Sequence, residues 1–202
     1  MITNYTSQQL INFEEDIAEC FNSAQIKAPI HLYNGNEEEM IKIFKNVHKE
    51  DWIFCSWRSH YQCLLKGVNP KLVKSDILKG KSITLCYPEQ NIYSSAIVTG
   101  NIPIATGVAL DIKRKNGNNH VWCFVGDMTS ETGTFYENHK YAVNHDLPIT
   151  YIIENNGKSV CTPTLEVWNQ DKLTYSDSTK KIIYYDYETK YPHAGAGQRI
   201  QF

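Results

Sequence analysis

Two uninterrupted apolar runs in the second half of the chain predict buried β-strands. Residues 121–125 read Val-Trp-Cys-Phe-Val, and residues 149–153 read Ile-Thr-Tyr-Ile-Ile. Neither run alternates apolar with polar positions, which is typical of strands that are covered on both faces. A helix-like segment separates the two runs, and residues 181–185 predict a later strand. The succession of strand, helix and strand indicates parallel pairing.

Apolar residues at helical spacing predict amphipathic helices elsewhere in the chain. The first covers residues 7–24, with Ser7 as its N-cap, and the second covers residues 37–47. Residues 102–112 predict a third, tightly packed helix. Pro103 suits the first turn of that helix, and its small residues let another backbone approach closely.

The segments between these elements are less regular. Residues 51–57 form a short apolar run, and residues 71–78 predict a short helix. Residues 80–97 are punctuated by Ser, Asn, Tyr and Gly and are expected to form an ordered loop. Such loops are more often functional than idle.

Helices that alternate with parallel-type strands predict an α/β fold in three layers, with a mostly parallel sheet and helices on both faces. A chain of this length is expected to form a single domain over residues 1–202. Within it we expect a helical N-terminal segment over residues 1–50 and an extended tail over residues 190–202.

Composition narrows the range of partners. The chain carries 20 Lys and Arg against 22 Asp and Glu, so its net charge of −2 gives no drive towards nucleic acid or anionic membranes. No apolar run approaches the roughly 20 residues that a membrane-spanning helix needs. The first residues lack a basic start and an apolar signal core, so a cytoplasmic location is expected. The six cysteines contain no C-x-x-C pair, which is typical of reduced thiols in such a protein.

Candidate chemistry lies where the two buried strands end. Asp127 follows the first strand, and Asn155 and Asn156 close the second. The carboxyl ends of neighbouring parallel strands meet at one edge of the sheet, so a carboxylate and a carboxamide are expected side by side. Such oxygens suit a hard cation such as Mg²⁺. The predicted metal ligands are Asp127, Asn156 and the backbone carbonyl of Lys158; alternatively, Asp127 only caps the next helix and the asparagines form a plain turn.

The residues around these positions resemble the thiamine diphosphate motif. Gly126-Asp127-Met128-Thr129-Ser130-Glu131 resembles its Gly-Asp-Gly opening, and Glu154-Asn155-Asn156-Gly157 resembles its closing Asn-Asn. The resembled family contains the alpha subunits of 2-oxo acid dehydrogenases, such as the first component of pyruvate dehydrogenase, and the resemblance covers roughly residues 26–164. It implies the diphosphate-binding domain of the thiamine diphosphate-binding fold, with thiamine diphosphate and Mg²⁺ as cofactors.

The resemblance also implies which residues of the motif contact the cofactor: Gly126, Asp127, Met128, Thr129 and Asn156. Backbone N–H groups at the start of the helix that follows Asp127 are suited to phosphate oxygens. Met128 stands where the family has glycine. A side chain there is harmless unless the backbone needs a positive φ.

Two further segments resemble the family before this motif. Trp57-Arg58-Ser59-His60 resembles Tyr-Arg-x-His, which implies that Trp57 and Arg58 bind the diphosphate and that His60 lies near the active site. A guanidinium suits phosphate because it donates two parallel N–H bonds. Residues 30–37 resemble His-Leu-x-x-Gly-Gln-Glu, which implies that His31 faces the substrate carboxylate or the activated thiazolium.

Residues 96–103 resemble Ile-Val-Gly-Ala-Gln-Ile-Pro, which implies that the backbone of Ala96 and Val98 contacts the aminopyrimidine ring. Each of these segments also has a plainer explanation. Arg58 can be a surface arginine, either histidine can be a satisfied structural residue, and residues 96–103 can be ordinary strand-to-helix packing.

Some family features are absent from this sequence. In the family, a beta subunit supplies the glutamate that activates the cofactor, and no segment here resembles the pyrimidine-binding domain. The resemblance therefore implies a beta-type partner in an alpha-beta heterotetramer. Ser82-Ile83-Thr84 stands where the family has Ser-Met-His, and His193 is a candidate substitute for a histidine on a loop that this chain lacks.

The resemblance implies an alpha-type subunit of a two-chain enzyme, an oxidoreductase that decarboxylates a 2-oxo acid and transfers the acyl or two-carbon unit. One alternative is a transketolase-like or carboligase enzyme that transfers a two-carbon unit to an aldehyde or keto-sugar. The other is a non-catalytic scaffold subunit. The sequence leaves the donor and the acceptor open.

Overall fold

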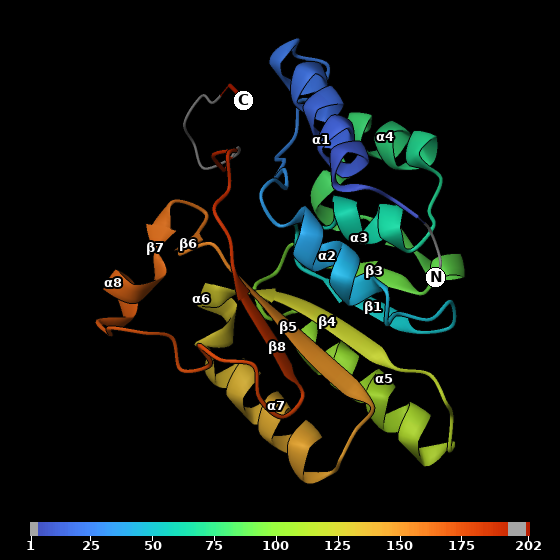
Figure 1. Ribbon diagram of the computed structural model, residues 1–202, viewed down its shortest axis with the longest axis vertical. Coiled ribbons are helices and arrows are strands. Elements are labelled where there is room, and N and C mark those ends of the chain that lie inside the picture. The colour runs from blue at the N-terminus through green and yellow to red at the C-terminus, as the bar shows by residue number, and fades with distance from the viewer. Residues whose placement is uncertain (1–3, 194–200) are drawn as a thin grey trace.

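The computed structural model describes residues 4–193 and 201–202, and its main sheet has six strands in the order β2-β3-β1-β4-β5-β8 (Figure 1). The strands are β1 (Trp52–Cys55), β2 (Cys86–Tyr87), β3 (Ile92–Ser94), β4 (Val121–Gly126), β5 (Ile149–Asn155) and β8 (Ile182–Asp186). Neighbouring strands are parallel except for the antiparallel pair of β2 and β3. The three predicted strands are confirmed as β4, β5 and β8, which lie side by side.

Helices cover both faces of this sheet (Figure 1). One layer contains α1 (Ser7–Asn22), α2 (Glu37–Phe44), α3 (His60–Leu65) and α4 (Pro70–Leu78), and the other contains α5 (Ile102–Arg114) and α7 (Gly133–Asn144). A separate cluster of buried apolar side chains fills the space between each layer and the sheet. The predicted three-layer α/β fold is therefore confirmed.

Strand β4 shows why its sequence does not alternate between apolar and polar residues. Trp122 and Phe124 belong to the cluster under the N-terminal helices, whereas Val121, Cys123 and Val125 belong to the cluster under α5 and α7. Successive side chains of a strand point to opposite faces, so a strand between two cores is apolar at every position.

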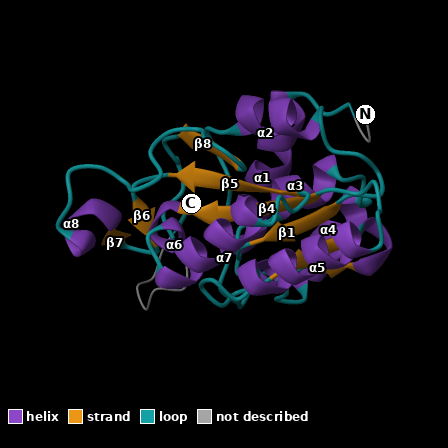
Figure 2. Ribbon diagram, turned by 90° about the horizontal axis from the view of Figure 1, so that it is seen from below, coloured by secondary structure: helices purple, strands orange, loops and turns teal. Residues whose placement is uncertain are grey.

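The register between β4 and β5 determines which residues leave the sheet together. Pairing runs from Val121 opposite Ile149 to Gly126 opposite Glu154, so the two strands end within one residue of each other. Beyond β5, the two-stranded unit of β6 (Lys158–Ser159) and β7 (Thr162–Pro163) and the short helix α8 (Thr164–Trp168) project from one end of the sheet (Figure 1, Figure 2).

Several local predictions differ from the structure. Thr6, and not Ser7, caps α1, because the Thr6 hydroxyl accepts from the Gln9 backbone N–H and the Gln9 side chain accepts from the Thr6 backbone N–H. Residues 80–97 are not only a loop, since they contain β2 and β3. Three-residue strands such as β3 have too few positions to show a period.

The tail predicted over residues 190–202 falls partly outside the described residues. Its last residue is described, and the Phe202 ring packs against Phe21 with ring centroids 4.9 Å apart. The Asn22 side chain also donates to the Phe202 backbone carbonyl over 2.9 Å. No helix in the described part of the chain is long and apolar enough to cross a bilayer.

Candidate functional site

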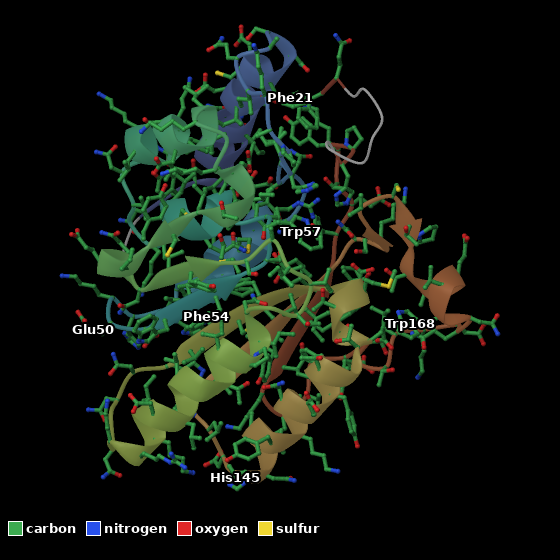
Figure 3. The ribbon with its side chains drawn as sticks, turned by 180° about the vertical axis from the view of Figure 1, so that it is seen from behind. Phe21, Glu50, Phe54, Trp57, His145 and Trp168 are labelled. Atoms are coloured by element: carbon green, nitrogen blue, oxygen red, sulfur yellow. The ribbon has the colours of Figure 1, made fainter. Side chains whose placement is uncertain are left out.

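One cavity lies at the edge of the sheet where β1, β4, β5 and β8 end, and Trp57 on its wall lies near the middle of the molecule (Figure 3). The lining residues are Ser56, Trp57, Arg58, Gly126, Asp127, Met128, Thr129, Glu154, Asn156, Lys158, Ser159, Tyr187 and His193. The four strands are parallel neighbours, so residues that are distant in sequence meet where they end.

Asp127 lies at the start of the short helix α6 (Asp127–Ser130), directly after β4, and its side chain is 1% exposed. Its Oδ2 accepts from the Thr164 hydroxyl, but its Oδ1 has no hydrogen-bond partner within the described structure. Burial raises the pKa of Asp127, although the Thr164 hydroxyl and nearby backbone amides work in the opposite direction. A buried carboxylate oxygen without a partner costs stability, and a bound cation would remove that cost.

Asn156 shares the cavity wall with Asp127. Its Nδ2 donates to the Tyr187 hydroxyl over 3.3 Å, and its Oδ1 accepts from the Lys158 backbone N–H over 3.2 Å. An amide oxygen has two lone pairs, so Oδ1 keeps one for a ligand. The structure therefore brings together the three residues that were predicted to hold the metal.

Arg58 lines the cavity as a cationic residue, as does Lys158, and it is only 8% exposed. Its Nη1 donates to the Tyr187 hydroxyl over 2.8 Å, and its guanidinium lies 5.6 Å from the centroid of the Tyr33 ring. Its Nε has no hydrogen-bond partner among the residues described. A buried guanidinium with an unused donor is suited to an anionic ligand.

Glu154 also lines the cavity, although no functional role was predicted for it. Its carboxylate accepts from the hydroxyls of Tyr185 and Tyr33, over 2.6 and 2.9 Å, and from the Asn36 side chain over 3.4 Å. Burial raises the pKa of Glu154 to about 7, while the phenol hydrogen bonds and Arg58 work against this rise. The sequence feature that could have indicated this residue is a single acidic position directly after the apolar run of β5.

Two histidines meet beside the cavity. The Nδ1 atoms of His31 and His193 are 3.1 Å apart, and the His31 ring lies 5.8 Å from the Trp57 ring. Burial, with a further contribution from Arg58, lowers the pKa of His31 to about 3 and that of His193 to about 4. Both imidazoles are therefore neutral near pH 7. His193 lines the cavity, and its Nε2 has no hydrogen-bond partner in the described structure.

Met128 keeps an ordinary backbone, because it is absent from the described residues with positive φ. Glycine is therefore not required at this position. The indole N–H of Trp168, which lies on the projecting α8 in Figure 3, donates to the Met128 sulfur over 3.1 Å. The Met128 side chain, which a glycine would lack, thus links the cavity wall to α8.

Four predicted site residues do not line the cavity: His31, His60, Ala96 and Val98. His31 lies beside it, against Trp57 and His193. His60 is fully buried, and its ring nitrogens contact Glu14 and Ser82, each over 2.9 Å. This position corrects its predicted catalytic role to a structural one. Ala96 and Val98 lie between β3 and α5, where both are exposed, so neither contacts a ring-binding wall within this chain.

The structural position of His60 predicts a stability defect in His60→Ala. The substitution removes the partner of Glu14 Oε2 and leaves this buried carboxylate with only the Tyr33 backbone N–H on Oε1, so the free energy of unfolding should fall by roughly 3–5 kcal/mol. Urea unfolding measures the change, and His48→Ala, at an exposed histidine, is the control. Unchanged stability together with lost binding of magnesium pyrophosphate would restore the catalytic interpretation.

The buried Glu154 predicts a pH-dependent stability. Its pKa is raised in the folded chain, so folding favours the protonated form and the free energy of unfolding should fall as pH rises from about 4.5 to about 7. Glu154→Gln should remove this part of the pH dependence, which amounts to roughly 3 kcal/mol. Urea unfolding of both proteins across this window tests it. Parallel pH profiles would contradict the assignment.

Comparisons with known proteins place this chain in a family. The family described as "Dehydrogenase E1 component" matches residues 5–182. The alpha subunit of acetoin:2,6-dichlorophenolindophenol oxidoreductase from Bacillus subtilis is 30% identical over 166 residues, which cover 77% of this chain and 50% of the relative. The alpha subunit of the pyruvate dehydrogenase E1 component from Rickettsia bellii is 32% identical over 163 residues, covering 76% of this chain and 50% of the relative.

Among solved structures, a putative thiamin diphosphate-dependent enzyme from Mycobacterium smegmatis is similar at a TM-score of 0.45 and 14% identity, covering 65% of this chain and 22% of the other. The chain spans about half the length of the curated relatives that it matches. With the family match over residues 5–182, the sequence settles its membership: this chain belongs to the dehydrogenase E1 component family.

Proposed function

We propose that this chain is the alpha-type, diphosphate-binding part of a two-chain enzyme that uses thiamine diphosphate and Mg²⁺ to decarboxylate a 2-oxo acid. The observation that carries the proposal is the unpartnered Oδ1 of Asp127, which lines one cavity with Asn156 and Arg58 in a member of the E1 family. A carboxylate, a carboxamide and a guanidinium around one cavity suit a divalent cation together with a diphosphate.

The residues present fit these cofactors. Asp127, Asn156 and the Lys158 carbonyl would hold Mg²⁺, while Arg58 and the backbone at Thr129 would bind the diphosphate. When bound, thiamine diphosphate supplies the electron sink that accepts the electron pair left on the substrate carbon when carbon dioxide departs.

The histidine pair beside the cavity would orient the substrate. Because both imidazoles are neutral, one Nδ1 donates to the other, which fixes the tautomers of the pair. If His31 Nδ1 carries the shared proton, His193 carries its own proton on Nε2, which has no other partner in the described structure. His193 would then donate this N–H to a substrate carboxylate, and His31 would hold its ring in place.

A beta-type partner would complete the site. Glu154 lies on the diphosphate side of the cavity and is held by phenols, so the glutamate that activates the cofactor ring would come from that partner. The exposed Ala96 and Val98 would contact the aminopyrimidine only within such an assembly, for which we propose an alpha-beta heterotetramer. A cytoplasmic location remains a prediction.

A second donor class has one observation in its favour. A relative with 30% identity is named for acetoin, a 2-hydroxyketone, rather than for a 2-oxo acid. The same cation and diphosphate site serves either donor, because the difference between them lies at the reacting carbon. Assays of the assembled enzyme therefore include both donors.

Loss of the carboxylate charge should abolish the metal site. Asp127→Asn keeps the shape of the side chain but removes the only charged ligand, so Mg²⁺-dependent binding of thiamine diphosphate should weaken by about 100-fold or more. Isothermal titration calorimetry measures the affinity, and Asp111→Asn, at an exposed site on α5, is the control. Equal affinities for the two variants would reject Asp127 as a ligand.

The split site predicts that activity needs two chains. The isolated chain should release almost no carbon dioxide from pyruvate. A beta-type partner should bring about this release together with transfer of the acyl unit to a lipoamide acceptor. Turnover with acetoin alone would favour the hydroxyketone, and turnover with an aldehyde acceptor would favour a carboligase. No reaction with any donor in the assembled pair would leave only the scaffold role. Robust turnover by the isolated chain would contradict the split site.

A further inference from the structure

The Tyr187 side chain is a cavity residue that lies outside the family match. The match ends at residue 182, and Tyr187 follows β8. Its backbone N–H donates to the Asn155 carbonyl over 2.9 Å, which ties the residue to the end of β5. Tyr187 is 8% exposed and lines the same cavity as Arg58 and Asp127.

The Tyr187 hydroxyl oxygen accepts two hydrogen bonds. Arg58 Nη1 donates to it over 2.8 Å, and Asn156 Nδ2 donates to it over 3.3 Å. These bonds occupy the oxygen as an acceptor and leave the hydroxyl hydrogen free to donate. None of the described residues accepts a hydrogen bond from this hydroxyl in the structure.

The Glu154 carboxylate does not take this hydrogen. Glu154 already accepts from the hydroxyls of Tyr33 and Tyr185 and from the Asn36 side chain. The ring centroids of Tyr185 and Tyr187 are 6.0 Å apart, yet their hydroxyls have different partners. The Tyr185 hydroxyl donates to Glu154, whereas the Tyr187 hydroxyl accepts from Arg58 at the cavity.

The Tyr187 hydroxyl stays protonated under ordinary conditions. Burial raises the pKa of Tyr187 to about 12, although the charge of Arg58 works in the opposite direction. A protonated phenol between a guanidinium and a carboxamide is an arrangement that binds an anionic oxygen.

We propose that Tyr187 is a direct anion-binding residue of the cavity, which donates its hydroxyl to a phosphate oxygen of a bound diphosphate while its oxygen holds Arg58 and Asn156 in place. This inference rests on the proposed function, because it needs the cavity to bind a diphosphate. It gives the segment beyond the family match a direct part in binding.

The test uses Tyr187→Phe, which keeps the ring and removes the hydroxyl. Titration calorimetry with inorganic pyrophosphate and Mg²⁺ should show binding that is weaker than wild type by roughly 10- to 100-fold. The matched control is Tyr184→Phe, because that phenol lies on the preceding strand and bonds to Asn155 and Asp186 outside the cavity. Its affinity should equal that of the wild type.

A second pair of variants separates direct donation from positioning. Adding Tyr187→Phe to an Arg58→Ala background, and separately to an Asn156→Ala background, should still weaken pyrophosphate binding, because the hydroxyl itself donates to the ligand. If Tyr187 only positions one of these two residues, the added substitution should have no effect in the background that lacks that residue, and direct donation is overturned. Thermal unfolding of each variant identifies a loss that comes from misfolding; in that case Tyr187→Trp, which brings a different donor, should recover part of the binding.

The outcomes also separate this inference from the proposed function. Tight binding by the wild type and by Tyr187→Phe alike would overturn the inference and leave the proposed function intact. No binding of pyrophosphate or thiamine diphosphate by the wild type, with or without a beta-type partner, would overturn both.

Discussion

The structure depends most on the parallel pairing of β4 with β5. Its register sets Gly126 opposite Glu154, so Asp127 and Asn156 leave the sheet within one residue of the same level. A slip of one residue would turn every side chain of a strand to the other face. Large aromatic side chains of β4 face one core and smaller side chains face the other. A slip would place side chains of the wrong size in each core, so close packing disfavours it.

Around this pairing the chain buries a cation and an acid without a direct contact between them. Arg58 donates to the Tyr187 hydroxyl, and Glu154 accepts from the hydroxyls of Tyr33 and Tyr185. Because phenols satisfy the acid, the guanidinium keeps an unused Nε for a ligand. Direct pairing of the two charges would have used the donors that an anion needs.

The sequence predicts the part of the site that follows from local order. Apolar runs that end near Asp127 and Asn156 predict that these residues meet in one cavity, because parallel strands present their carboxyl ends together. Roles that depend on distant partners were not predictable. His60 follows Arg58 closely in the chain, yet it bonds to Glu14 in the core. The surroundings of Glu154 and Tyr187 are set by contacts with residues that are distant in the sequence, so neither could be identified from its neighbours in the chain.

The position of β8 at the edge of the sheet has a consequence for assembly. Tyr187 and His193 come from the segment after this strand, so the cavity is incomplete until β8 has docked on β5. A nascent chain that has not yet added this strand therefore lacks part of the binding wall. By linkage, occupancy of the cavity would shift the docking equilibrium towards the docked strand, which covers the edge of β5.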